Sequence, residues 1–229
     1  MFDLHFLGRG AAFNPLWGNT NAWFSRGDTL VFLDFGEATF EKAVRTLDLA
    51  RQSRIIVILT HLHADHAGSL PSLCSYCSFV LGKKVEIIHP APAVVEFLTV
   101  TGIDPSLYIW HRTLPKDVGF SAEPVPVQHA SDMKCFGWVL RDEEETVYFS
   151  GDAATLPDPV REGFLSGRIS KLWHDTAGHD SAFHCSYAHL AELIPEERRE
   201  DVFCMHFDAD YVAAVRNLGF SVVETDAGG

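Results

Sequence analysis

No stretch of the 229-residue chain reaches the roughly 18 consecutive apolar residues that a membrane-spanning helix needs. The first five residues lack the basic start and the apolar core of a signal peptide. The five cysteines are odd in number, which argues against a disulfide framework, and Cys74 and Cys77 lack two further ligands at the spacing of a zinc site. We therefore expect a cytoplasmic protein with buried cysteine thiols and no membrane partner.

Positive charge is scarce, because 18 Lys and Arg residues stand against 31 Asp and Glu residues and the formal net charge is −13. The only adjacent basic pairs are at residues 83–84 and 198–199. An acidic protein repels a long polyanion. A small anionic substrate can still bind beside divalent cations, since these dominate the local field. The composition therefore disfavours a large nucleic acid as the partner.

Short apolar runs alternate with segments of helical periodicity along the whole chain. Residues 55–59 form a continuous apolar run, which is typical of a strand covered on both faces, and residues 37–52 before it have helical spacing. With no linker and no internal repeat, the pattern predicts one α/β domain of four layers over residues 1–229. The other predicted strands are 2–7, 21–25, 29–34, 85–88, 124–129, 135–141, 146–150, 169–173, 202–206 and 220–223. The other predicted helices are 65–79, 91–101, 159–165, 187–193 and 209–218.

The segment HLHADH directly follows the apolar run and places His61, His63, Asp65 and His66 within six residues. Sites in layered α/β folds collect at the carboxyl ends of such strands. Imidazole nitrogens and carboxylates are ligands for zinc and similar divalent ions. A polar loop rich in helix-capping residues is the alternative, but four ligand-type side chains at this density favour a metal site.

Three further residues of ligand type end later apolar runs: His129, Asp152 and His206. A single histidine or aspartate at the end of a strand is usually a hydrogen-bonded polar residue with no other role. Three of them, each behind an apolar run, favour a common site with the HLHADH segment.

In this order and context the residues resemble the metallo-β-lactamase superfamily, over nearly the whole chain. The resemblance rests on THLHADHAG at residues 60–68, SGD at 150–152, His129 and His206. It implies an αββα sandwich that carries two divalent metal ions, zinc or alternatively manganese, at one edge. The implied ligands form two groups joined by one bridging carboxylate: His61, His63 and His129; Asp65, His66 and His206; and Asp152 between them.

The resemblance also implies roles beyond direct ligation. Asp34, in VFLDFG, matches the early Asp-x-Gly of the superfamily and would orient a ligand histidine. Two metal ions can activate a shared water and stabilise charge on a phosphoryl oxygen. Asp65 is expected to be a catalytic residue as well as a metal ligand.

Two segments resemble the ribonuclease Z branch of this superfamily. LWHDT at residues 172–176 is similar to its HEAT segment, with Asp175 in place of Glu, and HCSYAHL from His184 is similar to its HST helix start, with Cys185 as the departure. The resemblance implies that His184 protonates the leaving oxygen while Asp175 holds its imidazole. A hydrogen bond at a helix start is the alternative for His184, and the neighbouring histidines 174, 179 and 189 are expected to have local structural roles.

The opening segment GRGAAFNPLWGNTNA, residues 8–22, is similar to the anti-Pycsar proteins of phages and bacteria, which are ribonuclease Z-like enzymes that degrade cyclic nucleotide signals. Asn19 and Asn21 would lie behind the metals or contact substrate, or else hold a polar loop through side-chain turns. In ribonuclease Z a tRNA-gripping arm is inserted between the positions of His129 and Asp152. Only 22 residues separate them here, and these are expected to form two strands and an acidic turn. No room is left for such an arm.

We therefore predict a metal-dependent phosphodiesterase that hydrolyses small phosphodiesters, 3′,5′-cyclic nucleotides foremost, to nucleoside monophosphates. The alternatives are a tRNA 3′-end endonuclease and a non-catalytic metal-binding or sensor protein. The branch commonly forms homodimers, so a second copy of the chain is the expected protein partner. Four aromatic residues could stack on a base, although a core position is favoured for each: Trp17, Trp23, Trp110 and Phe164.

Overall fold

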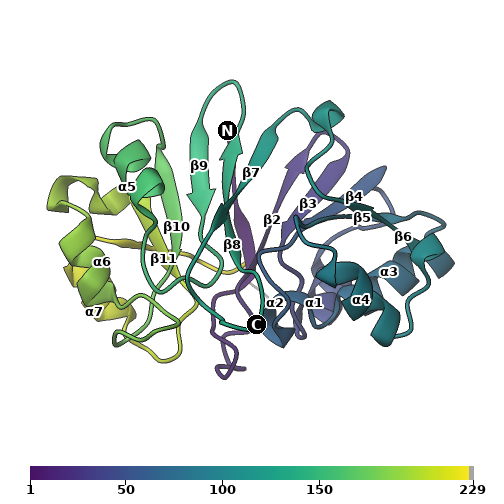
Figure 1. Cartoon of the computed structure of the whole chain (residues 1–229), viewed down its shortest axis with the longest axis horizontal. Coiled ribbons are helices and arrows are strands. Elements are labelled where there is room, and N and C mark those ends of the chain that lie inside the picture. Colours follow the sequence, from purple (N-terminus) through teal and green to yellow (C-terminus); the bar gives the residue numbers. More distant parts are fainter. Residues whose placement is uncertain (227–229) are drawn as a thin grey trace.

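Two six-stranded β-sheets form the centre of the structure, a computed structural model that describes residues 1–226. The strand orders are β1-β2-β3-β4-β5-β6 and β12-β11-β10-β9-β8-β7. Figure 1 shows α3 and α4 on the outer side of the first sheet and α5, α6 and α7 on the outer side of the second. This is the αββα architecture that the sequence predicts. The last three residues of the expected domain, 227–229, lie outside the described residues.

The first sheet contains three antiparallel strands followed by parallel strands. β1 (His5–Gly8), β2 (Asn21–Arg26) and β3 (Thr29–Leu33) pair antiparallel. The parallel strands after β3 are β4 (Arg54–Ile58), β5 (Val85–Ile88) and β6 (Tyr108–His111). The helices between and after them are α1 (Thr39–Thr46), α2 (Ala64–Ala67), α3 (Leu70–Phe79), α4 (Ala93–Val100) and the short 3-10 turns η1 (Pro105–Leu107) and η2 (Lys116–Val118).

The second sheet repeats this plan with other residues. β7 (Ser121–Pro126), β8 (Phe136–Arg141) and β9 (Thr146–Phe149) pair antiparallel. The parallel strands are β9, β10 (Lys171–Asp175), β11 (Val202–Met205) and β12 (Ser221–Val222). Its helices are α5 (Asp158–Leu165), α6 (Tyr187–Leu193), the 3-10 turn η3 (Glu196–Asp201) and α7 (Val212–Asn217).

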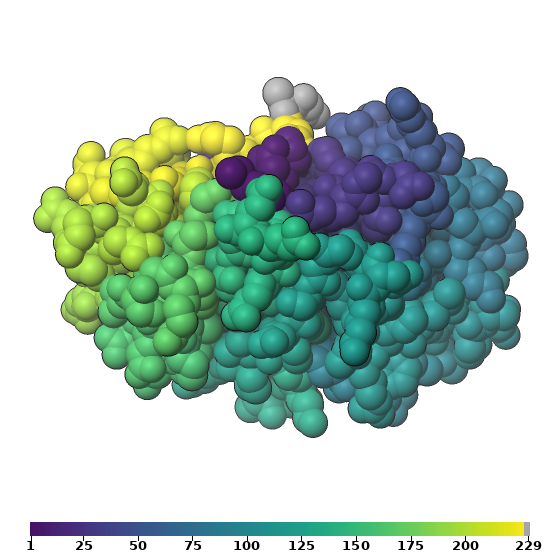
Figure 2. Space-filling model, turned by 90° about the horizontal axis from the view of Figure 1, so that it is seen from above, coloured from purple at the N-terminus to yellow at the C-terminus, as the bar shows by residue number. Residues whose placement is uncertain are grey.

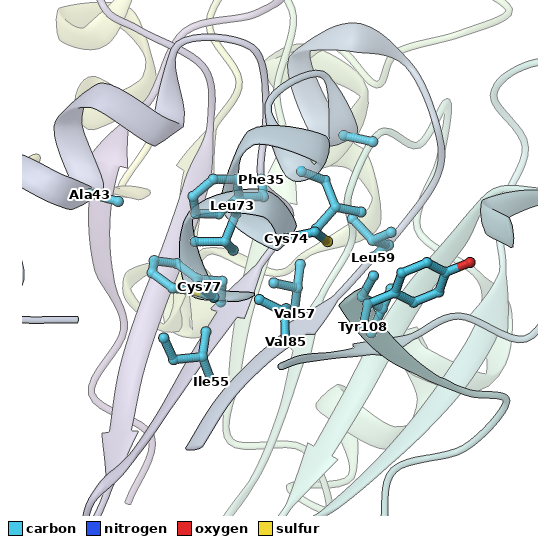
Figure 3. Packing of buried hydrophobic residues seen from close by; sticks show 14 of the residues in the cluster. Phe35, Ala43, Ile55, Val57, Leu59, Leu73, Cys74, Cys77, Val85 and Tyr108 are labelled. Atoms are coloured by element: carbon cyan, nitrogen blue, oxygen red, sulfur yellow. The ribbon is translucent and has the colours of Figure 1, made fainter. Parts of the chain in front are cut away.

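β4 is buried on both faces and so contributes to two hydrophobic clusters. Its side chains alternate, so that Ile55 and Val57 face the helices while Ile56 and Ile58 face the space between the sheets. All four are fully buried, and burial of each such side chain contributes about 1.5–3 kcal/mol. Figure 3 shows Ile55 and Val57 packed beneath α3.

All five cysteines are free and buried, as the sequence predicts. Cys74 and Cys77 lie on α3 and point into the helix-side core (Figure 3). Burial raises the pKa of Cys74 to about 12 and the pKa of Cys77 to about 11, so both remain protonated thiols at neutral pH. Within residues 1–226 no helix has the length and apolar character to cross a membrane.

The acidic turn between β8 and β9 anchors the start of the chain. The ammonium group of Met1 lies 3.0 Å from Asp142 Oδ2 and 2.8 Å from Glu144 Oε2, and the Arg26 guanidinium also pairs with Asp142. In Figure 2, seen from above, the purple N-terminal residues accordingly lie against this part of the second sheet. The turn thus ties the N-terminus to the second sheet, although Glu143 and Glu144 are themselves exposed.

Several predicted helices are longer than those in the structure: 91–101 and 209–218 are helical only as α4 and α7, and two further helices differ more. The segment 37–52 is helical only as α1, because Leu47 turns to extended backbone (φ −116°, ψ 137°) and lets Leu49 enter the core. The predicted helix 65–79 is divided into α2 and α3 at Ser69, whose hydroxyl donates to Gly36 O and accepts from Phe40 N at 3.1 Å. Tertiary contacts therefore outweigh helical periodicity at both places.

Strand predictions also differ from the structure: those at 2–7 and 169–173 correspond to β1 and β10, which begin three and two residues later. The strand predicted to end at His129 ends at Pro126, and two prolines are tolerated in β7 because it is an edge strand. His129 therefore lies on a loop three residues beyond the strand. β6 was not predicted; its sequence YIWH has a continuous apolar run of only three residues.

Candidate metal centre and active site

The predicted ligands converge at one edge of the two sheets, where the parallel strands end. The segment after β4 and its helix α2 supply four of them, and the loops after β7, β9 and β11 supply one each. Figure 1 places α2 at the lower edge of the sheets, close to the gap between them. Residues far apart in the sequence therefore meet because the carboxyl ends of parallel strands share one edge.

One group of ligand atoms belongs to His61, His63, His129 and Asp152, and these atoms lie within 4.8 Å of one another. His63 Nδ1 is 3.0 Å from His61 Nε2 and 3.1 Å from His129 Nε2. Asp152 Oδ2 lies 3.9 Å from His61 Nε2 and 3.5 Å from His129 Nε2. Three ring nitrogens and one carboxylate oxygen thus face a common point.

A second group belongs to Asp65, His66, Asp152 and His206. The Nε2 atoms of His66 and His206 each lie 3.2 Å from Asp65 Oδ2. They lie 3.0 Å and 3.2 Å, respectively, from Asp152 Oδ1. Asp152 thus presents one oxygen to each group, which is the placement that a bridging carboxylate needs.

The remaining hydrogen bonds of the histidines decide which ring nitrogen faces the centre. His66 Nδ1 donates to Asp34 Oδ2 at 2.7 Å, and His129 Nδ1 donates to Phe183 O at 2.9 Å. His61 Nδ1 lies 3.0 Å from the Thr60 hydroxyl, which itself donates to Asp34 at 2.7 Å and so accepts from the imidazole. When each ring is neutral with its proton on Nδ1, Nε2 presents a lone pair to the centre, as a metal ligand must.

Asp34 and Asn21 support this arrangement from behind. Asp34 also accepts from Thr60 N at 2.7 Å, and its φ of +64° is a left-handed conformation that costs about 1–3 kcal/mol for a residue other than glycine. Asn21 Nδ2 donates to Asp65 O at 3.3 Å, and its Oδ1 accepts from Gly36 N at 2.6 Å. Both side chains thus act through the backbone or ring of a candidate ligand.

Two glycines allow these segments to approach closely. A Cβ atom on Gly36 would lie 1.9 Å from Asp65 O. Gly151, directly before Asp152, has φ +58°, and a Cβ there would lie 2.6 Å from the Thr60 Cβ. The glycines of VFLDFG and SGD are therefore needed for contact with the HLHADH segment.

Asp175 joins His184 to this centre. Asp175 is fully buried at the end of β10 and accepts from His184 Nδ1 at 2.7 Å and from Ala153 N at 3.0 Å. Its other oxygen lies 3.3 Å from His206 Nδ1. The ring centroids of His184 and His206 are 5.3 Å apart, so His184 stands beside the second group with its Nε2 unused by Asp175.

Burial and charge set the protonation of the cluster. Burial lowers the pKa of His61 well below its usual range, which favours the neutral ligand form. Burial also acts to lower the pKa of His206, but Asp152, Asp175 and Asp65 outweigh it and raise this pKa to about 10. The pKa of His66 is raised in the same way by surrounding carboxylates, against the effect of burial.

The donor set fits divalent metal ions. His66 Nε2 and Asp152 Oδ1 are buried and lie 3.0 Å apart, yet neither makes a hydrogen bond. In the first group, His63 Nδ1 faces the Nε2 atoms of both His61 and His129. A proton on His63 Nδ1 can form a hydrogen bond to only one of them, so the other is left without a partner. Four buried carboxylates, Asp34, Asp65, Asp152 and Asp175, also need positive charge. Divalent cations would satisfy the orphaned atoms and the charge together.

A cavity of about 960 Å³ opens in front of the cluster. His63, His129, His184 and His206 form part of its wall, with Asp65 and Asp152. Acidic side chains of Glu37, Asp132 and Asp208 also line it, and no Lys or Arg of the described chain does. Any positive charge that meets an anionic substrate there must come from bound cations or protonated histidines.

The structure thus brings together every site residue that the sequence predicts. Of the histidines set aside, the buried His174 donates from Nδ1 to Asp175 O at 2.7 Å and His189 contacts Thr155 at 3.4 Å, whereas His179 lines the cavity. Asn19 holds a loop by accepting from Ala38 N at 2.8 Å.

None of the four aromatic candidates lines the cavity. Phe164 is fully buried, and Trp17 packs edge-on against Phe207. Phe13 and Phe183 line it instead. Phe13 was detectable as an apolar residue within a Gly- and Asn-rich segment, and Phe183 as the neighbour of His184.

Residues 20–207 match the model of the family described as the beta-lactamase superfamily domain. A protein of Bacillus phage 010DV004, named anti-Pycsar protein Apyc1, is 27% identical over 236 residues, covering 90% of this chain and 88% of that protein. The metallo-beta-lactamase fold protein YhfI from Bacillus subtilis superposes with a TM-score of 0.78 at 17% identity, covering 99% and 97% of the two chains. The short form of human tRNase Z superposes with a TM-score of 0.68 at 20% identity, covering 98% and 96%.

Proposed function

The chain belongs to the β-lactamase superfamily and is a metal-dependent hydrolase, and from this premise we propose that it is a phosphodiesterase for small phosphodiesters, 3′,5′-cyclic nucleotides foremost. The observation that carries the proposal is the His184–Asp175 pair beside the candidate metal centre, with 2.7 Å between Nδ1 and Oδ2. A phosphodiester needs a proton donor for its leaving alkoxide, and a carboxylate-held imidazole is suited to that role.

We propose that two zinc ions, or alternatively manganese ions, occupy the two groups of ligands. His61, His63 and His129 would hold one ion, with Asp152 as the bridge. Asp65, His66 and His206 would hold the other. When bound, such ions supply Lewis-acid stabilisation of the phosphoryl oxygens and a nucleophilic water.

His184 would act as the general acid. Burial acts to lower its pKa, but the hydrogen bond and charge of Asp175 outweigh burial and raise the pKa above its ordinary value. A larger fraction of His184 is therefore protonated at neutral pH. With Nδ1 held by Asp175, Nε2 would donate its proton to O3′ as the P–O3′ bond breaks, leaving a 5′-monophosphate.

The charge and shape of the site support a small substrate. Among residues 1–226 the cavity is lined by acidic side chains and by no Lys or Arg, so a polyanion would find no Lys or Arg there to neutralise its phosphates. Between His129 and Asp152 the chain forms a loop, β8 and β9, with no inserted arm. The likeness to tRNase Z concerns the fold, and tRNA 3′-end processing remains the second candidate activity, with a homodimer as the proposed assembly.

The test is hydrolysis of a panel of 3′,5′-cyclic mononucleotides by protein of measured zinc or manganese content. We expect formation of nucleoside monophosphates, and no turnover across the panel by metal-loaded protein would refute the proposal. Cleavage of precursor tRNA would support the second candidate instead.

The variant His184→Ala distinguishes an enzyme from a metal sensor. It should lower kcat by about 10²–10⁴-fold, the usual contribution of a general acid, while the metal content stays unchanged. Equal turnover by the variant and the wild type would exclude His184 as the proton donor.

A further inference from the structure

Two phenylalanine side chains remain exposed on the wall of the cavity. Phe13 is 98% exposed and Phe183 is 51% exposed. The other residues that line the cavity have polar or small side chains. Exposed aromatic surface forgoes the stabilisation that burial would give. What sets these two rings apart from other exposed apolar side chains is their place on the cavity wall, because ligand pockets are lined mainly by apolar and aromatic side chains.

The position of Phe183 is set by the same contacts that order the candidate ligands. Its carbonyl accepts from His129 Nδ1 at 2.9 Å, and the centroids of the two rings are 6.2 Å apart at an interplanar angle of 79°. The hydroxyl of Ser181 accepts from Phe183 N at 3.2 Å and from His184 N at 2.9 Å. Phe183 is thus held at a fixed place between a candidate ligand and the candidate acid.

Phe13 lies on a loop that is anchored although its side chain is free. Ala11 N and Asn14 Nδ2 both donate to Phe207 O, each at 3.0 Å, and Phe207 directly follows His206. Asn14 N also donates to Ala11 O at 3.0 Å, which closes a turn around Phe13. The ring is therefore exposed on an ordered backbone, tied to the segment that carries a candidate ligand.

We propose that Phe183 and Phe13 hold the nucleobase of the substrate while its phosphate faces the metal centre. This inference rests on the proposed function and adds the residues that recognise the base. Every base has a π-face, so stacking on aromatic side chains binds bases of different kinds. A cavity of about 960 Å³ has room for a nucleoside beside the phosphate.

The proposal predicts how the enzyme ranks its substrates. Stacking strength follows the overlapping ring area, so cyclic purine nucleotides should have lower KM values than cyclic pyrimidine nucleotides. Since a π-face carries no hydrogen-bond pattern, adenine and guanine should differ less from each other than either differs from cytosine or uracil.

The experiment compares Phe183→Ala and Phe13→Ala with the control Phe79→Ala. Phe79 is also strongly exposed but lies at the end of α3, outside the cavity. Each enzyme is assayed with 3′,5′-cyclic AMP and with a base-free ribose 3′,5′-cyclic phosphate. Removal of a stacking partner should raise KM for the nucleotide by about 5- to 100-fold. Both kcat for the nucleotide and kcat/KM for the base-free compound should change little, and Phe183→Tyr should restore KM.

The outcomes separate this inference from the proposed function. If the wild type hydrolyses no cyclic nucleotide, the proposed function fails. If it does, and both alanine variants keep the wild-type KM, stacking by these residues is refuted. An equal loss on the base-free compound would assign the residues to the shape of the site instead, and a change of oligomeric state on Phe13→Ala without a change in KM would assign Phe13 to a subunit contact.

Discussion

Replacing Asp175 with asparagine removes one buried negative charge while the shape of the side chain is kept. The amide oxygen of the variant can still accept from His184 Nδ1 and Ala153 N, as Asp175 Oδ2 does at 2.7 Å and 3.0 Å. The amide nitrogen would then face His206 Nδ1, where the second carboxylate oxygen now lies at 3.3 Å. The substitution therefore tests the charge of Asp175 rather than its packing.

The expected effect is a shift of the alkaline limb of the pH–rate profile. Asp175 raises the pKa of His184 against the effect of burial, so its neutralisation must lower that pKa. A hydrogen bond to a charged group contributes about 1.5–3 kcal/mol, which corresponds to about one to two pH units. A general acid works only while protonated, so the activity of the variant should decline at correspondingly lower pH.

The assay measures kcat against pH for the wild type and Asp175→Asn, with the metal content of both proteins determined. The matched control is Glu192→Gln, which neutralises an exposed carboxylate 3.4 Å from His189, outside the cavity. It should leave the profile unchanged. An unshifted alkaline limb in metal-loaded Asp175→Asn would refute the argument that Asp175 holds the proton on His184.

Three further predictions concern metal binding and the core. Chelation should lower Tm, increasingly so as pH rises from 6.5 towards about 10, because the raised pKa of His206 stabilises the metal-free fold at low pH and this contribution is lost over that window. A loss of Tm that is independent of pH would contradict this. Asp34→Asn should weaken metal affinity by about 10–100-fold in a chelator competition, since Asp34 orients His66. Ile56→Ala should lower the free energy of unfolding of the metal-loaded protein in urea by about 2–5 kcal/mol, because Ile56 is fully buried between the sheets.

Strands were easier to predict than the ends of helices. The run at residues 55–59 is apolar at every position, and β4 is indeed covered by helices on one face and by the second sheet on the other. Helical periodicity continued past Thr46, but the need to bury Leu49 ended α1 there. Periodicity indicates which face of a helix would be buried. The length of the helix depends instead on the tertiary contacts of the residues at its ends.

Local sequence was sufficient to place the metal-site candidates, since His61 to His66, Asp152 and His206 each follow a strand whose apolar residues mark it as buried. Neighbouring strand ends share one edge, so this pattern already brings their side chains together. Tertiary packing determined the positions of the other site residues. The loop after β7, rather than the strand, carries His129 to the centre, and Asp175 lies between His184 and His206 because β10 and β11 pair in parallel. Which aromatic rings are buried and which face the cavity likewise depends on contacts between distant segments, as Phe13 and Phe164 illustrate.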